Sequence, residues 1–204
     1  DVKSVTFFPS TEVYGLPEFA YFPYSENAGT DFTALNGNVP MVQTINESLD
    51  NIPGMYRYGY HKDTSDDESS FGFRHVMATI RWHLDVTGTE LEGRKLNNIQ
   101  IKVQRGTRNI SVCGDFTFNA ATGSYKAGAN TSNEVTINFE EMPVLENELT
   151  IYTSLFPSIK KGDYLYFTVN AVGKTATYKL KSAVTFQKNY AYTFSMPINE
   201  YSNL

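Results

Sequence analysis

Alternation of apolar and polar residues along the chain predicts a β protein. The clearest case is the segment Arg74–Val86, whose alternate residues are apolar: Val76, Ala78, Ile80, Trp82, Leu84 and Val86. A period of two places these side chains on one face of a strand, whereas helical spacing would scatter them around the axis. The pattern therefore predicts a long strand with one buried and one wetter face, as in an antiparallel sheet.

Shorter runs of the same kind follow in the second half of the chain. The polar, glycine-containing stretch 86–98 is typical of a loop or an interdomain linker. The runs beyond it are Ile99–Gln104, Ile110–Phe118, Val135–Phe139, Leu149–Leu155, Tyr164–Val169, Thr175–Leu180 and Tyr190–Ile198. Seven strands at this spacing are enough for a β-sandwich. We therefore expect a complete domain over residues 91–204.

The first half of the chain contains fewer strand-like runs. Besides the long strand, the candidates are Val5–Phe8, Phe19–Tyr21, Val39–Gln43 and Met55–Tyr60. Either this half leans on the second domain, or it keeps an open sheet edge that invites pairing with another chain. The pattern thus predicts an all-β chain of two tandem antiparallel β-sandwich domains, residues 1–90 and 91–204, the first of them short of strands.

Composition and charge narrow the function. The chain has 17 Lys and Arg against 22 Asp and Glu, a net charge of −5. This balance argues against a nucleic-acid partner, because clustered cations carry the affinity for phosphate backbones. No run reaches the roughly 18 consecutive apolar residues of a membrane span. The chain begins at Asp1 without Met, so we expect a processed form whose export signal or lipid anchor lay upstream.

The residue types used in catalysis and metal binding do not form a recognisable site. Cys113 is the single cysteine and lies in an alternating apolar run, which favours a strand residue over a nucleophile and excludes a Cys-based zinc site. His61 stands apart, and His75 and His83 are eight residues apart on one predicted strand, or about 26 Å. The acidic stretch Asp63–Ser70 lacks the EF-hand pattern, so a solvated loop is favoured over an ion site. We expect no metal and no cofactor.

A non-enzymatic protein is the expectation that follows. A secreted hydrolase stays as an alternative, because β-sandwiches can hold carboxylate pairs that a sequence alone cannot locate.

Three segments, taken in order, resemble one known family. Ala20–Ser25 (Ala-Tyr-Phe-Pro-Tyr-Ser) is similar to an A-Y-Y-P-Y element, and Phe73–Ile80 is similar to an F-x-H-x-x-A-x-(I/V) strand. Phe186–Tyr192 resembles a closing strand, F-x-x-G-K-x-Y-x-Y, with Asn189 able to adopt the left-handed conformation where the family has Gly. Together they resemble the fimbrillin-like (Mfa-like, FimA-type) surface proteins of Bacteroidales.

The resemblance implies two transthyretin-like domains, export as a lipoprotein to the outer membrane and cell surface, and adhesion as a pilus subunit of the stalk, tip or anchor. In related pilins a strand from the next subunit fills a groove, so the implied partners are other pilin subunits, with a host protein or glycan as a further partner. The strand whose alternate residues suit such an exchange supplies the candidate assembly residues Tyr190, Tyr192, Phe194, Met196 and Ile198.

A second hypothesis is an adhesin module that binds a glycan or a host receptor. Tyr56, Tyr58 and Tyr60 are its candidate ligand contacts, because aromatic faces offer apolar area beside a polar hydroxyl. Tyrosines of this kind are also common within strands, which is the competing explanation.

Overall fold

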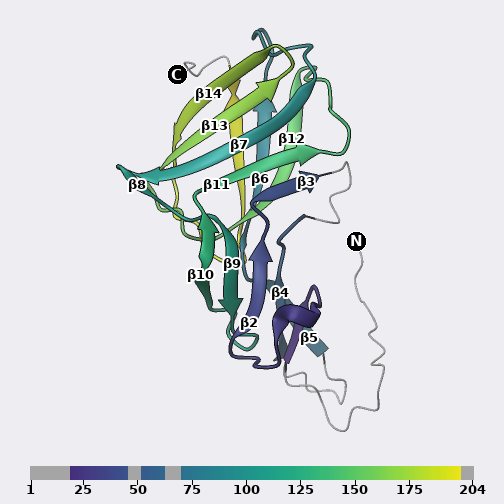
Figure 1. Cartoon of the computed structure of the whole chain (residues 1–204), viewed down its shortest axis with the longest axis vertical. Coiled ribbons are helices and arrows are strands. Elements are labelled where there is room, and N and C mark those ends of the chain that lie inside the picture. Colours follow the sequence, from purple (N-terminus) through teal and green to yellow (C-terminus); the bar gives the residue numbers. More distant parts are fainter. Residues whose placement is uncertain (1–18, 46–51, 63–69, 199–204) are drawn as a thin grey trace.

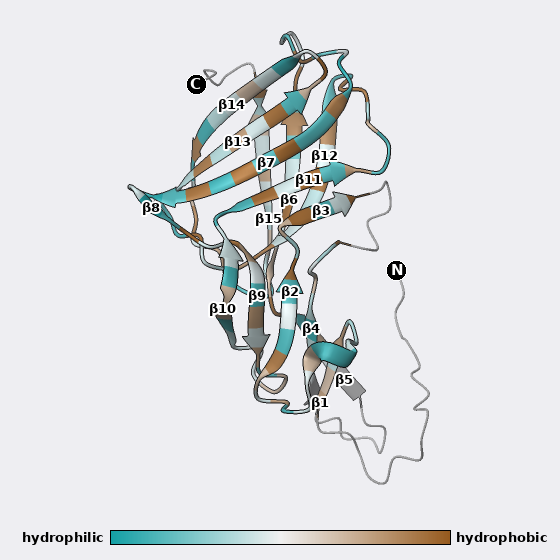
Figure 2. Cartoon of the chain, in the orientation of Figure 1, coloured by the Kyte–Doolittle hydropathy of each residue, from teal (hydrophilic) through white to brown (hydrophobic). Residues whose placement is uncertain are grey.

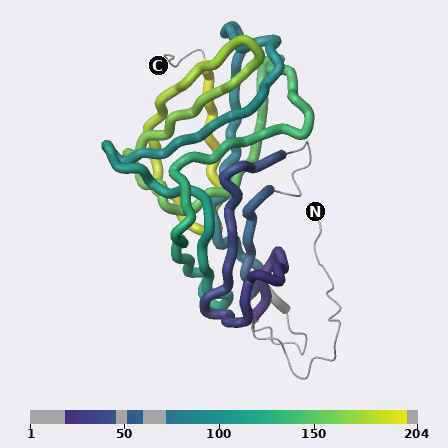
Figure 3. The backbone as a smooth tube through the Cα atoms, in the orientation of Figure 1, coloured from purple at the N-terminus to yellow at the C-terminus, as the bar shows by residue number. Residues whose placement is uncertain are grey.

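The structure, a computed structural model, describes residues 19–45, 52–62 and 70–198 of the 204-residue chain. Its strands form two bodies that lie one beyond the other along the long axis (Figures 1 and 3). The one helical element in the described ranges is a 3-10 turn, Glu26–Ala28. No helix in that part of the chain is long and apolar enough to span a membrane. The predicted all-β fold is confirmed, whereas the predicted run Val5–Phe8 lies outside the described residues.

The large body is a sandwich of two sheets. Its strands are β3 (Val42–Ile45), β6 (Ala78–Asp85), β7 (Leu96–Arg105), β8 (Arg108–Asn109), β11 (Glu134–Phe139), β12 (Glu148–Leu155), β13 (Tyr164–Ala171), β14 (Lys174–Lys181) and β15 (Ala191–Pro197). The wider sheet has the order β14-β13-β7-β11-β3, with β8 beside β7, and the narrower sheet has the order β12-β6-β15. Most pairings are antiparallel, but β3 with β11 and β15 with β6 are parallel.

Trp82 joins the two sheets of the large body. Its side chain is fully buried, and its ring lies 5.4 Å from the ring of Phe167 on β13 and 5.0 Å from that of Phe194 on β15. The indole N–H donates a 2.9 Å hydrogen bond to the Thr153 hydroxyl on β12. Along β7 and β13, hydrophobic and hydrophilic residues alternate as the sequence pattern predicts (Figure 2). Burial of one face of each sheet therefore builds this core.

The small body packs two three-stranded antiparallel sheets. Its strands are β1 (Phe19–Phe22), β2 (Leu35–Val39), β4 (Arg57–Lys62), β5 (Ser70–His75), β9 (Cys113–Phe118) and β10 (Tyr125–Ser132). One sheet has the order β1-β4-β5 and the other β10-β9-β2. The Tyr21 and Phe118 rings are 6.2 Å apart across the two sheets, and the Tyr56 and Phe116 rings are 5.1 Å apart. Aromatic packing holds this body together.

The predicted single strand Arg74–Val86 is wrong, because it is two strands. β5 ends at His75 and β6 begins at Ala78. Between them the Val76 N–H donates to the Tyr56 carbonyl, and the Met77 carbonyl accepts from the Asn189 N–H. Val76, Met77 and Ala78 are all buried, so the alternation of burial is interrupted at the point where the chain passes from the small body into the large one.

The sheet pairings do not follow a division at residues 90 and 91. β3 and β6 precede that point, yet they pair with β11 and with β12 and β15. The predicted run Ile110–Phe118 does not enter the large body, since its part β9 pairs with β2 and β10. Stretch 86–98 is not a linker either: the Leu91 side chain is buried and the Arg94 guanidinium donates to the Val172 carbonyl. Each body therefore draws on both halves of the chain.

Candidate functional site

The last strand of the chain lies at the edge of the narrower sheet. β15 pairs with β6 on one side, and within the described ranges no strand pairs with its other side. Natural proteins cover or blunt such edges, because unpaired backbone groups are a template for another chain. The edge of β15 is therefore a candidate binding site for an extended segment.

The register shows which backbone groups of β15 face the open edge. The Thr79 N–H donates to the Tyr190 carbonyl, and Ala191 is the register partner of Thr79. Since backbone groups of alternate residues point to opposite sides of a strand, those of Tyr192 and its alternate neighbours face β6. The groups of Ala191, Thr193 and Ser195 therefore face away from the sheet, toward the open edge.

Pro197 belongs to the same outward-facing set. A proline has no N–H, so it is tolerated in a sheet only where no ladder bond is needed. At position 197 it costs no bond to β6, and it leaves the open edge without a donor at that point. The open edge thus offers donors and acceptors at Ala191, Thr193 and Ser195 and ends at Pro197.

The five candidate assembly residues lie on β15 or directly beside it, and most of them face the core. Met196 and Ile198 are buried, and the Phe194 ring stacks on Trp82. The Tyr192 ring stacks on Phe186 with 4.5 Å between the ring centroids. Tyr190, which precedes the strand, is 58% exposed. The buried side chains of Met196 and Ile198 therefore anchor the end of β15 in the core, whereas those of Tyr192 and Phe194 stay half-buried at the edge of the sandwich.

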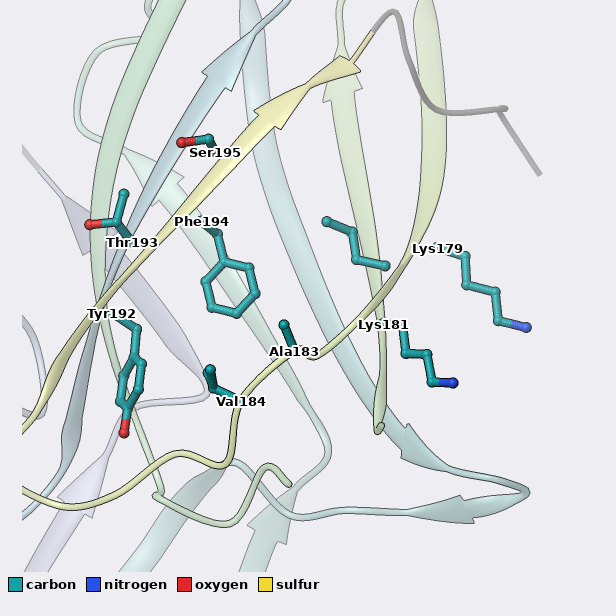
Figure 4. A pocket seen from close by; sticks show the side chains of 9 residues that line it. Lys179, Lys181, Ala183, Val184, Tyr192, Thr193, Phe194 and Ser195 are labelled. Carbon is teal, nitrogen blue, oxygen red and sulfur yellow. The ribbon is translucent and has the colours of Figure 1, made fainter. Parts of the chain in front are cut away.

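A groove of about 400 Å³ runs between the open edge of β15 and the edge strand of the facing sheet, β14. Tyr192 and Phe194 line one wall, and Leu180, Ala183 and Val184 line the other. Figure 4 shows the two aromatic side chains on the side of Ala183 and Val184, whereas the side chains of Lys179 and Lys181 extend away. The groove is thus largely apolar, and along it runs an edge that pairs with no strand in the described part of the chain.

The segment 182–190 joins β14 to β15 and carries Ala183 and Val184 in the wall of the groove. The Tyr192 hydroxyl accepts a hydrogen bond from the Gln187 N–H at 2.8 Å and lies 3.3 Å from the Thr185 carbonyl. Asn189 has a positive φ of 64°, which confirms the left-handed conformation expected from the sequence. Its side-chain oxygen accepts from the His75 N–H at 2.9 Å, so the segment also ties the groove to the small body.

The tyrosines of the glycan hypothesis lie elsewhere. The Tyr58 side chain is only 4% exposed, and a Cβ added at Gly123 would lie 2.0 Å from its ring. Tyr56 packs on Phe116, and its hydroxyl accepts from the Asn38 N–H. The Tyr58 ring is therefore covered by protein, whereas Tyr56 is partly buried and its hydroxyl is already hydrogen-bonded. The side chain of Tyr60 is outside the described part of the structure.

Titratable residues form no cluster that could hold a metal in the described ranges. His83 lies 3.1 Å from the Thr150 hydroxyl in the large body, whereas His75 is in the small body. Burial, and then the charge of Arg57, lowers the pKa of His75. Cys113 is buried, and burial raises the pKa of its thiol to about 11, which disfavours the thiolate that a nucleophile needs. Of the acidic stretch Asp63–Ser70, residues 63–69 lie outside the described part of the chain. Only the backbone of His61, in β4, and of Ser70, in β5, is described.

The sequence pointed to β15 but missed the second wall of the groove. Leu180 is buried and was expected only as part of a strand, and Val184 is 42% exposed. An exposed valine after a strand is a weak signal, and it becomes informative only once β14 and β15 are known to lie on the same side of the sandwich.

Comparison with known proteins agrees with this architecture. A family model described as fimbrillin-like matches residues 3–204. A proposed cell adhesion protein from Bacteroides uniformis ATCC 8492 has a solved structure that is 16% identical with a TM-score of 0.56, over 91% of this chain and 68% of that one. A second one, from Bacteroides ovatus ATCC 8483, is 19% identical with a TM-score of 0.57, over 98% and 72%. A search of curated proteins finds no match.

The two solved structures are similar to this chain at identities that show a shared fold alone. The family model, in contrast, spans all but the first two residues of the chain. It also agrees with the family indicated by the three ordered sequence motifs. The chain therefore belongs to the fimbrillin-like family.

Proposed function

We propose that this protein is a non-enzymatic cell-surface adhesion protein that assembles as a fimbrial subunit by accepting a strand from another subunit in the groove beside β15. Membership of the fimbrillin-like family supports adhesion and a place at the cell surface. The single observation that carries the strand addition is the edge of β15, with which no described strand pairs, next to an apolar groove.

The physics of the groove fits an extended segment. A strand added beside β15 would pair with the backbone of Ala191, Thr193 and Ser195, which supplies affinity independent of sequence. Every second side chain of that strand would enter the groove and pack on Phe194 and Leu180, which supplies specificity. An incoming segment with apolar residues at alternate positions therefore meets both requirements.

Little protects this edge against pairing. Side chains that blunt a natural edge are charged residues, lysine above all, and proline. The outward-facing side chains of β15 are Ala191, Thr193 and Ser195, which are small and uncharged, and only Pro197 limits the ladder. An edge with so little protection is consistent with a surface that another subunit covers.

A peptide experiment tests the proposal. A synthetic peptide that copies Tyr190–Ile198 carries the required alternation, and a peptide of the same composition in scrambled order is its control. We expect the copied peptide to raise the melting temperature by several degrees, since a ligand at a hundredfold excess over its Kd stabilises by about 2.7 kcal/mol. Equal or negligible stabilisation by the two peptides in differential scanning calorimetry would contradict strand acceptance.

A further inference from the structure

A second surface of the large body does not depend on strand addition. One side of the wider sheet, here called the polar face, is formed by the outward side chains of four strands. They are the alternate residues 98–104 of β7, 164–170 of β13, 175–181 of β14 and 134–138 of β11. Their neighbours along each strand are buried in the core. In Figure 1 this sheet lies in front, and no described element is drawn over it.

The polar face is unusual in what it lacks. None of its outward positions carries an aliphatic side chain, although Val42 on the edge strand β3 of the same sheet is exposed beside Thr136. Protein interfaces are centred on buried apolar or aromatic anchors, and here Tyr164 and Tyr166 are the only such groups at the outward positions, so a protein partner would find few anchors. Nucleic acid is also unsuitable, because the face carries only Lys102, Lys179 and Lys181 as cations.

The charge of the face is opposite in sign to that of the whole protein. Its three lysines stand against one acid, Glu134, a local charge of about +2 by simple count, whereas the chain carries −5. The Lys179 ammonium lies 4.3 Å from the ring centroid of Tyr164 and 5.6 Å from that of Tyr166. At the centre of the face Lys102 stands beside Glu134 and the two charges balance, so the excess positive charge that attracts an anion comes from Lys179 and Lys181 on β14. Most of the remaining groups are amides and hydroxyls.

At the centre of the face is a shallow hollow of about 320 Å³. Tyr166, Lys102 and Glu134 stand side by side across β13, β7 and β11, because Lys102 is the register partner of both of the others. Gln100 lies one step along the face from Lys102. A ring, an amide, an ammonium and a carboxylate thus converge on a site roughly the size of a small ligand.

The polar side chains around the hollow differ in whether they already form hydrogen bonds with one another. At its rim the Thr168 and Thr177 hydroxyls are 2.9 Å apart, and the Asn170 amide donates to Asn98 at 2.7 Å. In contrast, the side chains of Gln100, Lys102 and Glu134 have no hydrogen-bond partner among the described residues. The rim is therefore fixed by its own bonds, and the centre keeps its bonding capacity for a ligand.

We propose that the polar face binds an oligosaccharide that carries carboxylates, such as a chain of uronic acids. The Lys102 ammonium would pair with a sugar carboxylate, the Gln100 amide and the Glu134 carboxylate would bond to sugar hydroxyls, and the Tyr166 ring would pack on the apolar face of a sugar ring. This assigns the sugar-binding capacity to a different body from the tyrosines first considered. It is consistent with adhesion but does not depend on strand addition.

Isothermal titration calorimetry of the full chain with a galacturonic acid tetrasaccharide tests this proposal, with the uncharged galactose tetrasaccharide as a second ligand. We expect saturable binding of the acidic sugar that weakens at high salt, and weaker binding of the neutral one. Lys102→Gln should weaken the binding of the acidic sugar about tenfold, the loss expected for one hydrogen bond to a charged group, and Gln100→Ala about fivefold, since its bond to a sugar hydroxyl is neutral. Lys126→Gln is the matched control, since Lys126 is exposed on β10 in the small body.

Three results would overturn the proposal. One is the absence of saturable binding to the acidic tetrasaccharide. Another is an equal loss of affinity in Lys126→Gln and Lys102→Gln, which would show that net charge alone attracts the sugar. The last is a dimer in analytical ultracentrifugation that Lys102→Gln dissociates, which would assign the polar face to a second copy of the chain. Circular dichroism of each variant checks that the fold is retained.

Discussion

Replacing Trp82 with alanine is expected to destabilise the protein by about 3–5 kcal/mol, the usual cost of truncating a buried aromatic residue. The Trp82 ring contacts Phe167 in the facing sheet and Phe194 on β15, so the cavity would open between both sheets and beneath the strand that borders the groove. The free energy of unfolding of a domain is about 5–15 kcal/mol in all, so this loss would be a large part of it. Urea denaturation followed by circular dichroism measures the change.

Trp82→Phe separates packing from hydrogen bonding. It keeps an aromatic ring but loses the indole N–H that donates to the buried Thr153 hydroxyl. We expect a smaller loss of about 1–3 kcal/mol, because a buried acceptor is left unpaired. A loss below about 1 kcal/mol for Trp82→Ala would show that Trp82 is not the centre of the large body.

The second large effect is expected on assembly and not on stability. Thr193→Pro removes a backbone N–H that faces the open edge of β15, so the ladder to β6 keeps all of its bonds. Pro197 shows that this strand accommodates proline at a position of the same orientation. We expect the variant to fold with nearly unchanged stability and to lose the stabilisation by the Tyr190–Ile198 peptide.

Two variants control this experiment. Thr193→Val changes the same side chain but keeps the N–H, so it should respond to the peptide like the unmodified protein. Tyr192→Pro removes a donor that faces β6 and should destabilise the large body. If Thr193→Pro still binds the peptide as tightly as Thr193→Val, the incoming strand does not pair with this edge.

Local patterns predicted most strands, and the exceptions have identifiable causes. β10 was missed because its residues are polar and largely exposed, so no alternation marks it. The start of β2 was missed because Gly37 and its neighbouring asparagines are typical of a turn. Gly37 is needed there, since a Cβ would lie 2.3 Å from the Phe116 ring. A glycine required by a ring in another strand cannot be distinguished from a turn glycine in a single sequence.

The candidate site could be predicted only in part, for a related reason. The alternation in β15 is a local property, and it correctly indicated a strand with one apolar face. Which edge is open depends on the parallel pairing of β15 with β6, more than a hundred residues earlier in the chain. Likewise the tyrosines Tyr56 and Tyr58 are typical of a ligand site in the sequence, yet in the fold Tyr58 is buried and Tyr56 packs on Phe116 of β9. Long-range pairing decides both outcomes.

Amide hydrogen exchange measured by NMR, with and without the Tyr190–Ile198 peptide, tests the strand addition most directly. The amides of Tyr192, Phe194 and Met196 face β6 and should exchange slowly in both samples. Those of Ala191, Thr193 and Ser195 should exchange fast in the free protein and slow markedly when the peptide binds. Peptide binding that leaves these three amides as fast as before would contradict the account.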